Sequence, residues 1–195
     1  MSTFQRRPSY SRGIVSLLIA GVVLTTAAPG WGGDPGRIAL EYELKAVFIS
    51  KLISFVEWPG EAFASSSAPL SIRVLGEDPF GEVLQQALGD SLISGRPVEV
   101  AQVDRLDELW DVHVLFVSNS EQERLCDVLQ AIDGRPVLSI SDFANFSERG
   151  GVLTLGMRQQ RVRLSVNAAA YRRAGLTISA KLLQISSQVA EEPCP

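Results

Sequence analysis

The chain has 195 residues, of which 46% are hydrophobic and 21% are charged, and its formal net charge is −4. This composition is too apolar for a disordered chain and too charged for a protein with several membrane spans. Residues 1–30 hold three arginines and no acidic residue, so the remainder has 15 basic and 22 acidic side chains, a formal charge of −7. No basic run offers a surface for nucleic acid, and about 165 residues suit one domain. Nucleic-acid binding and a two-domain architecture are therefore disfavoured.

The N-terminus has the three-part pattern of a secretory signal peptide. Three arginines within residues 1–12 precede an uncharged apolar stretch over residues 13–28, and a Pro-Gly pair then interrupts any helix. Cleavage is predicted near Ala28 or Gly30. An uncleaved membrane anchor is the alternative, because residues 13–33 contain no charge. We expect residues 1–30 to be a signal peptide, residues 31–37 to be a linker, and the mature protein to function in the periplasm.

Helical and strand patterns alternate along the mature chain. The predicted elements are helix 38–58, strand 70–75, helix 79–88, strand 97–103, strand 112–117, helix 119–132 and strand 136–140. The first helix has apolar residues at i, i+3 and i+4 spacing and ends before Pro59 and Gly60. The strand at 112–117 is almost continuously apolar, which is typical of a central strand covered on both faces.

The pattern changes after residue 150. Residues 152–155 and 162–166 alternate between apolar and polar side chains across a short turn, which predicts an antiparallel hairpin. Two closing helices are predicted at 168–174 and 178–189, separated by Gly175. The predicted fold class is α/β: a single three-layer domain over residues 38–189, with a mostly parallel open sheet flanked by helices, the C-terminal hairpin and the two closing helices.

The sequence offers little catalytic chemistry. His113 is the only histidine, and it lies in an apolar strand where a hydrogen-bonded structural role is favoured over a catalytic one. No Gly-x-Ser-x-Gly motif accompanies it, and the spacings of metalloproteases and deaminases are absent. We predict no catalytic residue, no metal and no cofactor, and we favour a binding function over an enzymatic one.

A candidate ligand crevice lies between the strand at 70–75 and the helix that follows it. Gly76, Asp78 and Gly81 mark this turn, which is where open α/β sheets commonly bind ligands. The turn lacks the spacing of a phosphate loop, and two acidic side chains would repel phosphate. Two interpretations remain: a tight turn in which Asp78 caps the helix, or a site for a small ligand with a cationic group.

A candidate partner-binding surface is centred on the predicted hairpin. Its residues are Arg161, Arg163, Asn167, Tyr171, Phe143 and Phe146. The two arginines form a local basic patch in an acidic protein, which suits an acidic partner or a carboxylate ligand, or they are simply the solvated face of a half-buried strand. Asn167 has a helix N-cap as its structural alternative, and the phenylalanine pair is more often part of a core than an exposed binding patch.

Two cysteines remain in the mature chain. Cys126 falls in a predicted helix, where a small buried side chain is the simplest interpretation. Cys194 falls in a Pro-flanked segment, residues 190–195, which we expect to be a mobile tail. Spacing alone leaves open whether the two form a disulfide. Two thiols without clustered histidines exclude a disulfide-rich scaffold and a zinc site.

Several segments together resemble a known family. The first is residues 43–59, a helix that closes on Phe-Val-x-Trp-Pro, and the second is Gly-Arg-Pro-Val-Leu-Ser-Ile-Ser-Asp at 134–142. Gly150-Gly151, Arg-Val-Arg-Leu-Ser-Val-Asn at 161–167 and Gly-Leu-Thr-Ile-Ser-Ala-Lys-Leu-Leu at 175–183 follow in order. Their order and spacing are similar to the YfiR-like family of exported bacterial regulators over about residues 40 to 188.

The resemblance implies a periplasmic α/β protein that forms a homodimer and has no enzymatic activity. The founding member holds the periplasmic sensor domain of an inner-membrane diguanylate cyclase inactive, and an outer-membrane lipoprotein can sequester it. Related domains also occur in or near sensor histidine kinases. By analogy we expect this chain to repress such a cyclase and lower cyclic di-GMP. A periplasmic ligand-sensing accessory protein of a histidine kinase is the alternative.

One departure from the family limits the analogy. The founding regulator carries two cysteine pairs that link its activity to redox state. The corresponding regions here, residues 110–113 and 143–151, contain no cysteine. Redox control through those pairs is therefore not expected in this chain.

Overall fold

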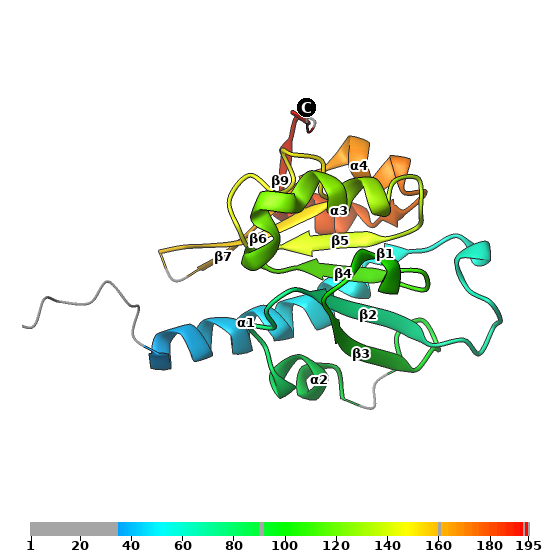
Figure 1. Cartoon of the computed structure of the whole chain (residues 1–195), viewed down its shortest axis with the longest axis horizontal. Helices are drawn as coiled ribbons and strands as arrows, with labels where there is room; N and C mark the ends of the chain where they lie inside the picture. The colour runs from blue at the N-terminus through cyan, green and yellow to red at the C-terminus, as the bar shows by residue number, and fades with distance from the viewer. Residues whose placement is uncertain (1–34, 90–91, 160, 193, 195) are drawn as a thin grey trace, which may run out of the picture. The chain divides into compact units, whose positions relative to one another are not determined.

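The structure is a computed structural model that describes residues 35–89, 92–159, 161–192 and 194 (Figure 1). The predicted signal peptide and the first part of the predicted linker lie outside these residues. From the start of the first helix onward, the chain forms a single compact unit.

A seven-stranded sheet forms the centre of this unit. Its strand order is β3 (Val98–Val103), β2 (Leu70–Leu75), β4 (Val114–Val117), β5 (Leu138–Ser141), β6 (Leu153–Arg158), β7 (Arg161–Asn167) and β9 (Ser187–Val189). All neighbours from β3 to β6 are parallel, β7 runs antiparallel to β6, and β9 runs parallel to β7. The prediction of a mostly parallel sheet that ends in an antiparallel hairpin is therefore confirmed.

Helices cover the two faces of the sheet. They are α1 (Pro35–Ile53), α2 (Glu82–Leu88), α3 (Leu125–Ala131), α4 (Ala168–Arg173) and α5 (Ala180–Ile185), with 3₁₀ turns η1 (Gly60–Ala62), η2 (Leu106–Glu108) and η3 (Asn119–Arg124). A small second sheet pairs β1 (Val56–Glu57) with β8 (Thr177–Ile178). Within the described ranges, none of these helices has both the length and the apolarity that a bilayer crossing requires.

Alternation along β4 divides the core into two parts. Val114 and Phe116 join the larger cluster, which contains the apolar face of α1, and Leu115 and Val117 join the smaller cluster beneath α3. All four side chains are buried, as expected of a central strand with a helix layer on each face. The three-layer arrangement follows directly from this pattern.

The chain departs from the predicted elements where distant strands pair. We expected one helix over residues 178–189, but α5 is short and Ser187–Val189 pairs with Ser165–Asn167 as β9. The first helix ends at Ile53 because Val56 and Glu57 pair with β8. In both places a tertiary hydrogen-bonded pairing overrides a local helical pattern.

The helix after β2 also begins later than predicted. It starts at Glu82, because Asp78 accepts a hydrogen bond from the backbone N–H of Phe80 (2.8 Å) and so closes a turn before the helix. Asp78 therefore stabilises the turn and does not cap the helix.

The C-terminal tail is fixed at two points in its described part. Cys194 forms a disulfide with Cys126 of α3, with 5.6 Å between the two Cα atoms. The backbone N–H of Glu192 donates to the carbonyl oxygen of Glu148 at 2.6 Å. We predicted a mobile tail over residues 190–195, whereas these two contacts hold its described part against the domain. The sequence left open whether the two cysteines are bonded, and in the structure they form a disulfide.

We predict that replacing both cysteines, Cys126→Ser with Cys194→Ser, lowers the free energy of unfolding by about 2–4 kcal/mol. The reason is that the disulfide closes a loop across 68 residues of sequence and so restricts the unfolded chain. Urea unfolding of the oxidised protein and of the variant measures the difference. Two titratable thiols in the denatured, unreduced protein would contradict the assignment.

Candidate functional site

Three arginines lie on one face of the β6–β7 hairpin. Arg158 is paired in register with Arg161, and Gly156 is paired with Arg163, so all three arginines point to the same side. Each is exposed, and none forms an ion pair within the part of the chain that the structure describes. Because Gly156 has no side chain opposite Arg163, this face is open as well as basic.

The outer edge of the hairpin is only partly covered. β9 pairs with Ser165, Val166 and Asn167 of β7, and on this side, away from β6, no described strand pairs with residues 161–164. The backbone groups on this stretch therefore form an open sheet edge beside the arginines. Figure 1 shows the hairpin reaching to the left beyond α3.

Asn167 and Tyr171 of the predicted surface are buried. Asn167 is a helix cap: its Oδ1 accepts from the N–H of Ala170 at 2.9 Å, and its Nδ2 donates to the carbonyl of Ser147 at 2.7 Å. Tyr171 packs into the larger core cluster. Both side chains position α4 beneath the surface and do not reach a partner.

Phe143 and Phe146 belong to the core beneath α3. Their rings meet edge to face with 5.4 Å between centroids. A Cβ atom at Gly151 would overlap the ring of Phe146, so this glycine of the Gly150-Gly151 pair is required by packing. Both phenylalanines are buried, which fits the prediction that they belong to the core. Of the residues predicted to bind a partner, only Arg161 and Arg163 are exposed.

The predicted crevice at Gly76, Asp78 and Gly81 is filled at Gly76 by side chains of η3, whereas no atom of the described residues lies near the Cβ position of Gly81. Ser120 and Glu121 occupy the space where a Cβ of Gly76 would lie. The hydroxyl of Ser120 accepts from the N–H of Glu77 at 3.0 Å. This arrangement fits a tight turn, but the predicted role of Asp78 as the helix cap is wrong, because α2 begins after Gly81.

A buried ion pair joins α1 to the end of β5. The ammonium of Lys45, only 3% exposed, lies 2.6 Å from Oδ2 of Asp142 and 2.5 Å from Oε1 of Glu41. Tyr42 donates its hydroxyl to Asp142 at 2.8 Å, and burial together with this bond raises the pKa of Tyr42. No sequence motif predicted this group, although a lysine on the buried face of an amphipathic helix is a signal for a buried ion pair.

His113 has a structural position between β2 and β4. Its Nδ1 accepts from the backbone N–H of Ser71 (3.1 Å), so in the neutral ring Nε2 carries the proton and donates to the carbonyl of Ala62 (3.0 Å). The ring stacks on Phe63 with 4.3 Å between centroids. Burial lowers the pKa of His113 below its usual value. These contacts fit the predicted structural role.

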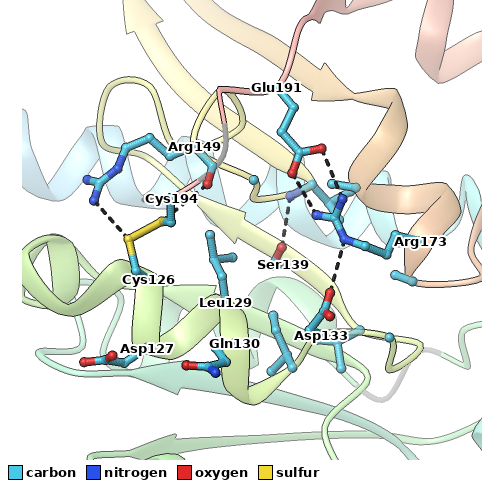
Figure 2. A pocket seen from close by; sticks show the side chains of 17 residues that line it. Cys126, Asp127, Leu129, Gln130, Asp133, Ser139, Arg149, Arg173, Glu191 and Cys194 are labelled. Carbon is cyan, nitrogen blue, oxygen red and sulfur yellow. Dashed lines mark hydrogen bonds and ion pairs between the residues drawn. A yellow bond between two sulfur atoms is a disulfide. The ribbon is translucent and has the colours of Figure 1, made fainter.

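A pocket lies between α3, α4 and the C-terminal tail, a feature that the sequence analysis did not anticipate (Figure 2). Its volume is about 570 Å³, within the range of small-molecule sites. At the rim of the pocket, Arg173 of α4 forms ion pairs with Glu191 of the tail and with Asp133. The disulfide between Cys126 and Cys194 forms part of the wall. Neither here nor elsewhere in the described ranges is a group of three or more His, Cys, Asp or Glu side chains arranged to hold a metal ion.

Comparison with known proteins defines the class. The YfiR/HmsC-like family description matches residues 42–187, which is most of the chain. The chain therefore belongs to the YfiR/HmsC-like family, as the ordered segments had predicted.

Two solved structures are similar in fold. One is an ABC domain in complex with L-Trp from Streptococcus pneumonia, at 14% identity and a TM-score of 0.54 over 74% of this chain and 60% of that chain. The other is a conserved domain protein from Vibrio cholerae, at 13% identity and a TM-score of 0.48 over 75% of this chain and 59% of that chain. This chain thus spans about three fifths of each. At such low identity, the first likeness supports the fold and carries nothing about function.

We predict that Lys45→Met destabilises the protein by about 3–5 kcal/mol, because it leaves the carboxylate of Asp142 buried without a cation. The double variant Lys45→Met/Asp142→Asn should lose less than the two single variants combined, because it removes both charges. Urea unfolding measures each value, with Lys51→Met on the exposed face of the same helix as the control. A loss below about 1 kcal/mol for Lys45→Met would contradict a buried, uncompensated charge.

We also predict that the stability of the protein falls between pH 7 and pH 5. The pKa of His113 is lower in the folded than in the unfolded protein, so the unfolded chain takes up the proton first as the pH falls below about 6.5. The slope from this group is at most about 1.4 kcal/mol per pH unit. His113→Gln should lower stability but remove this part of the slope, as measured by urea midpoints across that pH range. An unchanged slope would show that other groups cause it.

Proposed function

We propose that this protein is a non-enzymatic periplasmic regulator that binds the extracytoplasmic domain of an inner-membrane diguanylate cyclase and represses it. Membership of the YfiR/HmsC-like family over residues 42–187 is the observation that carries the proposal. The signal-peptide pattern of residues 1–30 supports export, and the absence of an assembled catalytic group at His113 supports a binding function.

The contact surface in this proposal is the arginine face of the hairpin. Arg158, Arg161 and Arg163 are exposed and lack carboxylate partners within the described residues, in a chain with an acidic balance beyond residue 30. An acidic patch on the partner would gain charge-assisted hydrogen bonds there. The open edge at residues 161–164 adds backbone donors and acceptors that an extended segment of the partner can use.

Repression by binding requires a difference in affinity between two states of the partner. The regulator must bind the inactive conformation of the cyclase domain more tightly than the active one. A preference of about 3–5 kcal/mol moves such an equilibrium from mostly active to mostly inactive. An interface of about 800 Å² on each side is large enough to supply that preference.

The first test compares cyclic di-GMP in a deletion strain and its complemented parent. We expect the level to rise on deletion, because the cyclase loses its repressor. The full-length gene should reverse the rise, and a form that lacks residues 1–30 should not, because it stays in the cytoplasm. An unchanged level on deletion would reject the cyclase assignment and favour the histidine-kinase alternative.

The same strains test the proposed contact surface. Arg161→Glu/Arg163→Glu should fail to reverse the rise and should weaken binding to the partner domain by on the order of tenfold or more. Arg37→Glu/Arg172→Glu changes two exposed arginines on other elements and is the matched control. Urea unfolding verifies that both variants remain folded. If the hairpin variant represses normally while deletion still raises cyclic di-GMP, the function stands and the contact surface is wrong.

A further inference from the structure

The pocket beneath the C-terminal tail has a lining of mixed polarity. Its apolar residues are Leu129, Ile132, Val137, Val152, Ala170 and Ala174, which lie in α3 and α4 or next to these helices and to the strands β5 and β6. Ser139 adds one hydroxyl to the interior. The volume is about 570 Å³, and the apolar part of the lining suits the hydrocarbon part of a small molecule.

At the rim of the pocket, the guanidinium of Arg173 forms a forked pair of hydrogen bonds with a carboxylate of the tail. Nη1 and Nη2 of Arg173 donate to the two carboxylate oxygens of Glu191 at 3.1 and 3.0 Å, and Nε lies 3.2 Å from Oδ1 of Asp133 (Figure 2). Two parallel N–H···O bonds are the geometry in which arginine binds a carboxylate from any source. Glu191 therefore occupies the position that a ligand carboxylate would take.

The tail holds Glu191 in place by tethering more than by the strength of the ion pair. The hydrogen bond from the N–H of Glu192 and the disulfide of Cys194 fix the chain after Glu191, and the pairing of β9 with β7 fixes it before this residue. This tether keeps a high local concentration of the carboxylate near Arg173. The Arg173 side chain is 43% exposed, and ion pairs with that exposure are weak, so a free carboxylate can displace Glu191.

The surrounding charges favour a ligand with one negative charge. Asp127 and Asp133 also line the pocket, and they would repel a multiply charged anion such as phosphate. The second cation, Arg149, points elsewhere: its guanidinium donates to the carbonyl of Gln122 at 3.5 Å and contacts the sulfur of Cys126 at 3.9 Å. Arg173 is thus the cation whose fork faces the position of the carboxylate.

We propose that this pocket binds a small organic monocarboxylate with an apolar body. The ligand carboxylate takes the place of Glu191 on Arg173, and the apolar body lies against the lining that begins at Leu129. Glu191 acts as a built-in competitor that leaves the fork when the ligand binds. Gly150 leaves room beside the carboxylate position, because a Cβ there would lie 3.4 Å from Oε1 of Glu191. Its backbone φ of +110° also favours glycine.

Calorimetric titration of the purified protein with phenylacetate tests the proposal. Glu191→Gln removes the competing charge and should tighten binding about fivefold, which corresponds to an exposed ion pair of about 1 kcal/mol. Arg173→Gln should weaken binding at least about tenfold, because the fork is lost. Phenylacetamide has the same shape without the charge and should bind more weakly than phenylacetate to every form that retains Arg173.

Matched variants separate this binding from general effects on folding. Arg172→Gln changes the neighbouring exposed arginine, and Glu192→Gln changes the neighbouring glutamate of the tail, and both should bind phenylacetate as the unmodified protein does. If Arg173→Gln does not fold, the comparison of Glu191→Gln with Glu192→Gln still decides the question. The proposal is overturned if Glu191→Gln shows no saturable binding up to about 10 mM, or if phenylacetamide binds as well as phenylacetate. The titration needs no protein partner and is independent of the proposed repression.

Discussion

The buried ion pair between Lys45 and Asp142 is the constraint on which much of this structure depends. An ammonium that is almost fully removed from water is tolerated only when carboxylates surround it. Lys45 satisfies that requirement with Asp142 and Glu41, and Tyr42 adds a hydrogen bond to the same carboxylate. The pair fixes α1 across the carboxyl end of β5. It also joins two of the segments that carry the family resemblance, residues 43–59 and 134–142.

A second constraint is the polar network on the α3 side of the sheet. The hydroxyl of Ser139 accepts from the N–H of Val152, the N–H of Ser147 donates to Oγ1 of Thr154, and Asn167 donates to the carbonyl of Ser147. These hydrogen bonds fix the 142–152 loop and the start of α4 on the sheet. Ser139 of this network also lines the pocket beneath the tail.

The two candidate binding features lie on one side of the same sheet. Ser141 of β5 is in register with Thr154, and Thr154, Gly156 and Arg158 alternate along β6, so the arginine face continues the surface on which α3 packs. Among the residues that the structure describes, the hairpin arginines have no carboxylate partner, whereas Arg173 in the pocket is paired with Glu191 and Asp133 of its own chain. The two sets of arginines therefore differ in whether a described carboxylate already binds them.

The sequence by itself determined the class of fold and the hairpin. Continuous apolar runs such as residues 112–117 require cover on both faces, and strict alternation in residues 162–166 requires a half-exposed strand, so local pattern was sufficient. Only the tertiary structure decided that residues 187–189 form a strand, that Cys194 pairs with Cys126, and that Asn167 and Tyr171 are buried. Each of these depends on a contact between residues far apart in the chain, and no local periodicity records such contacts.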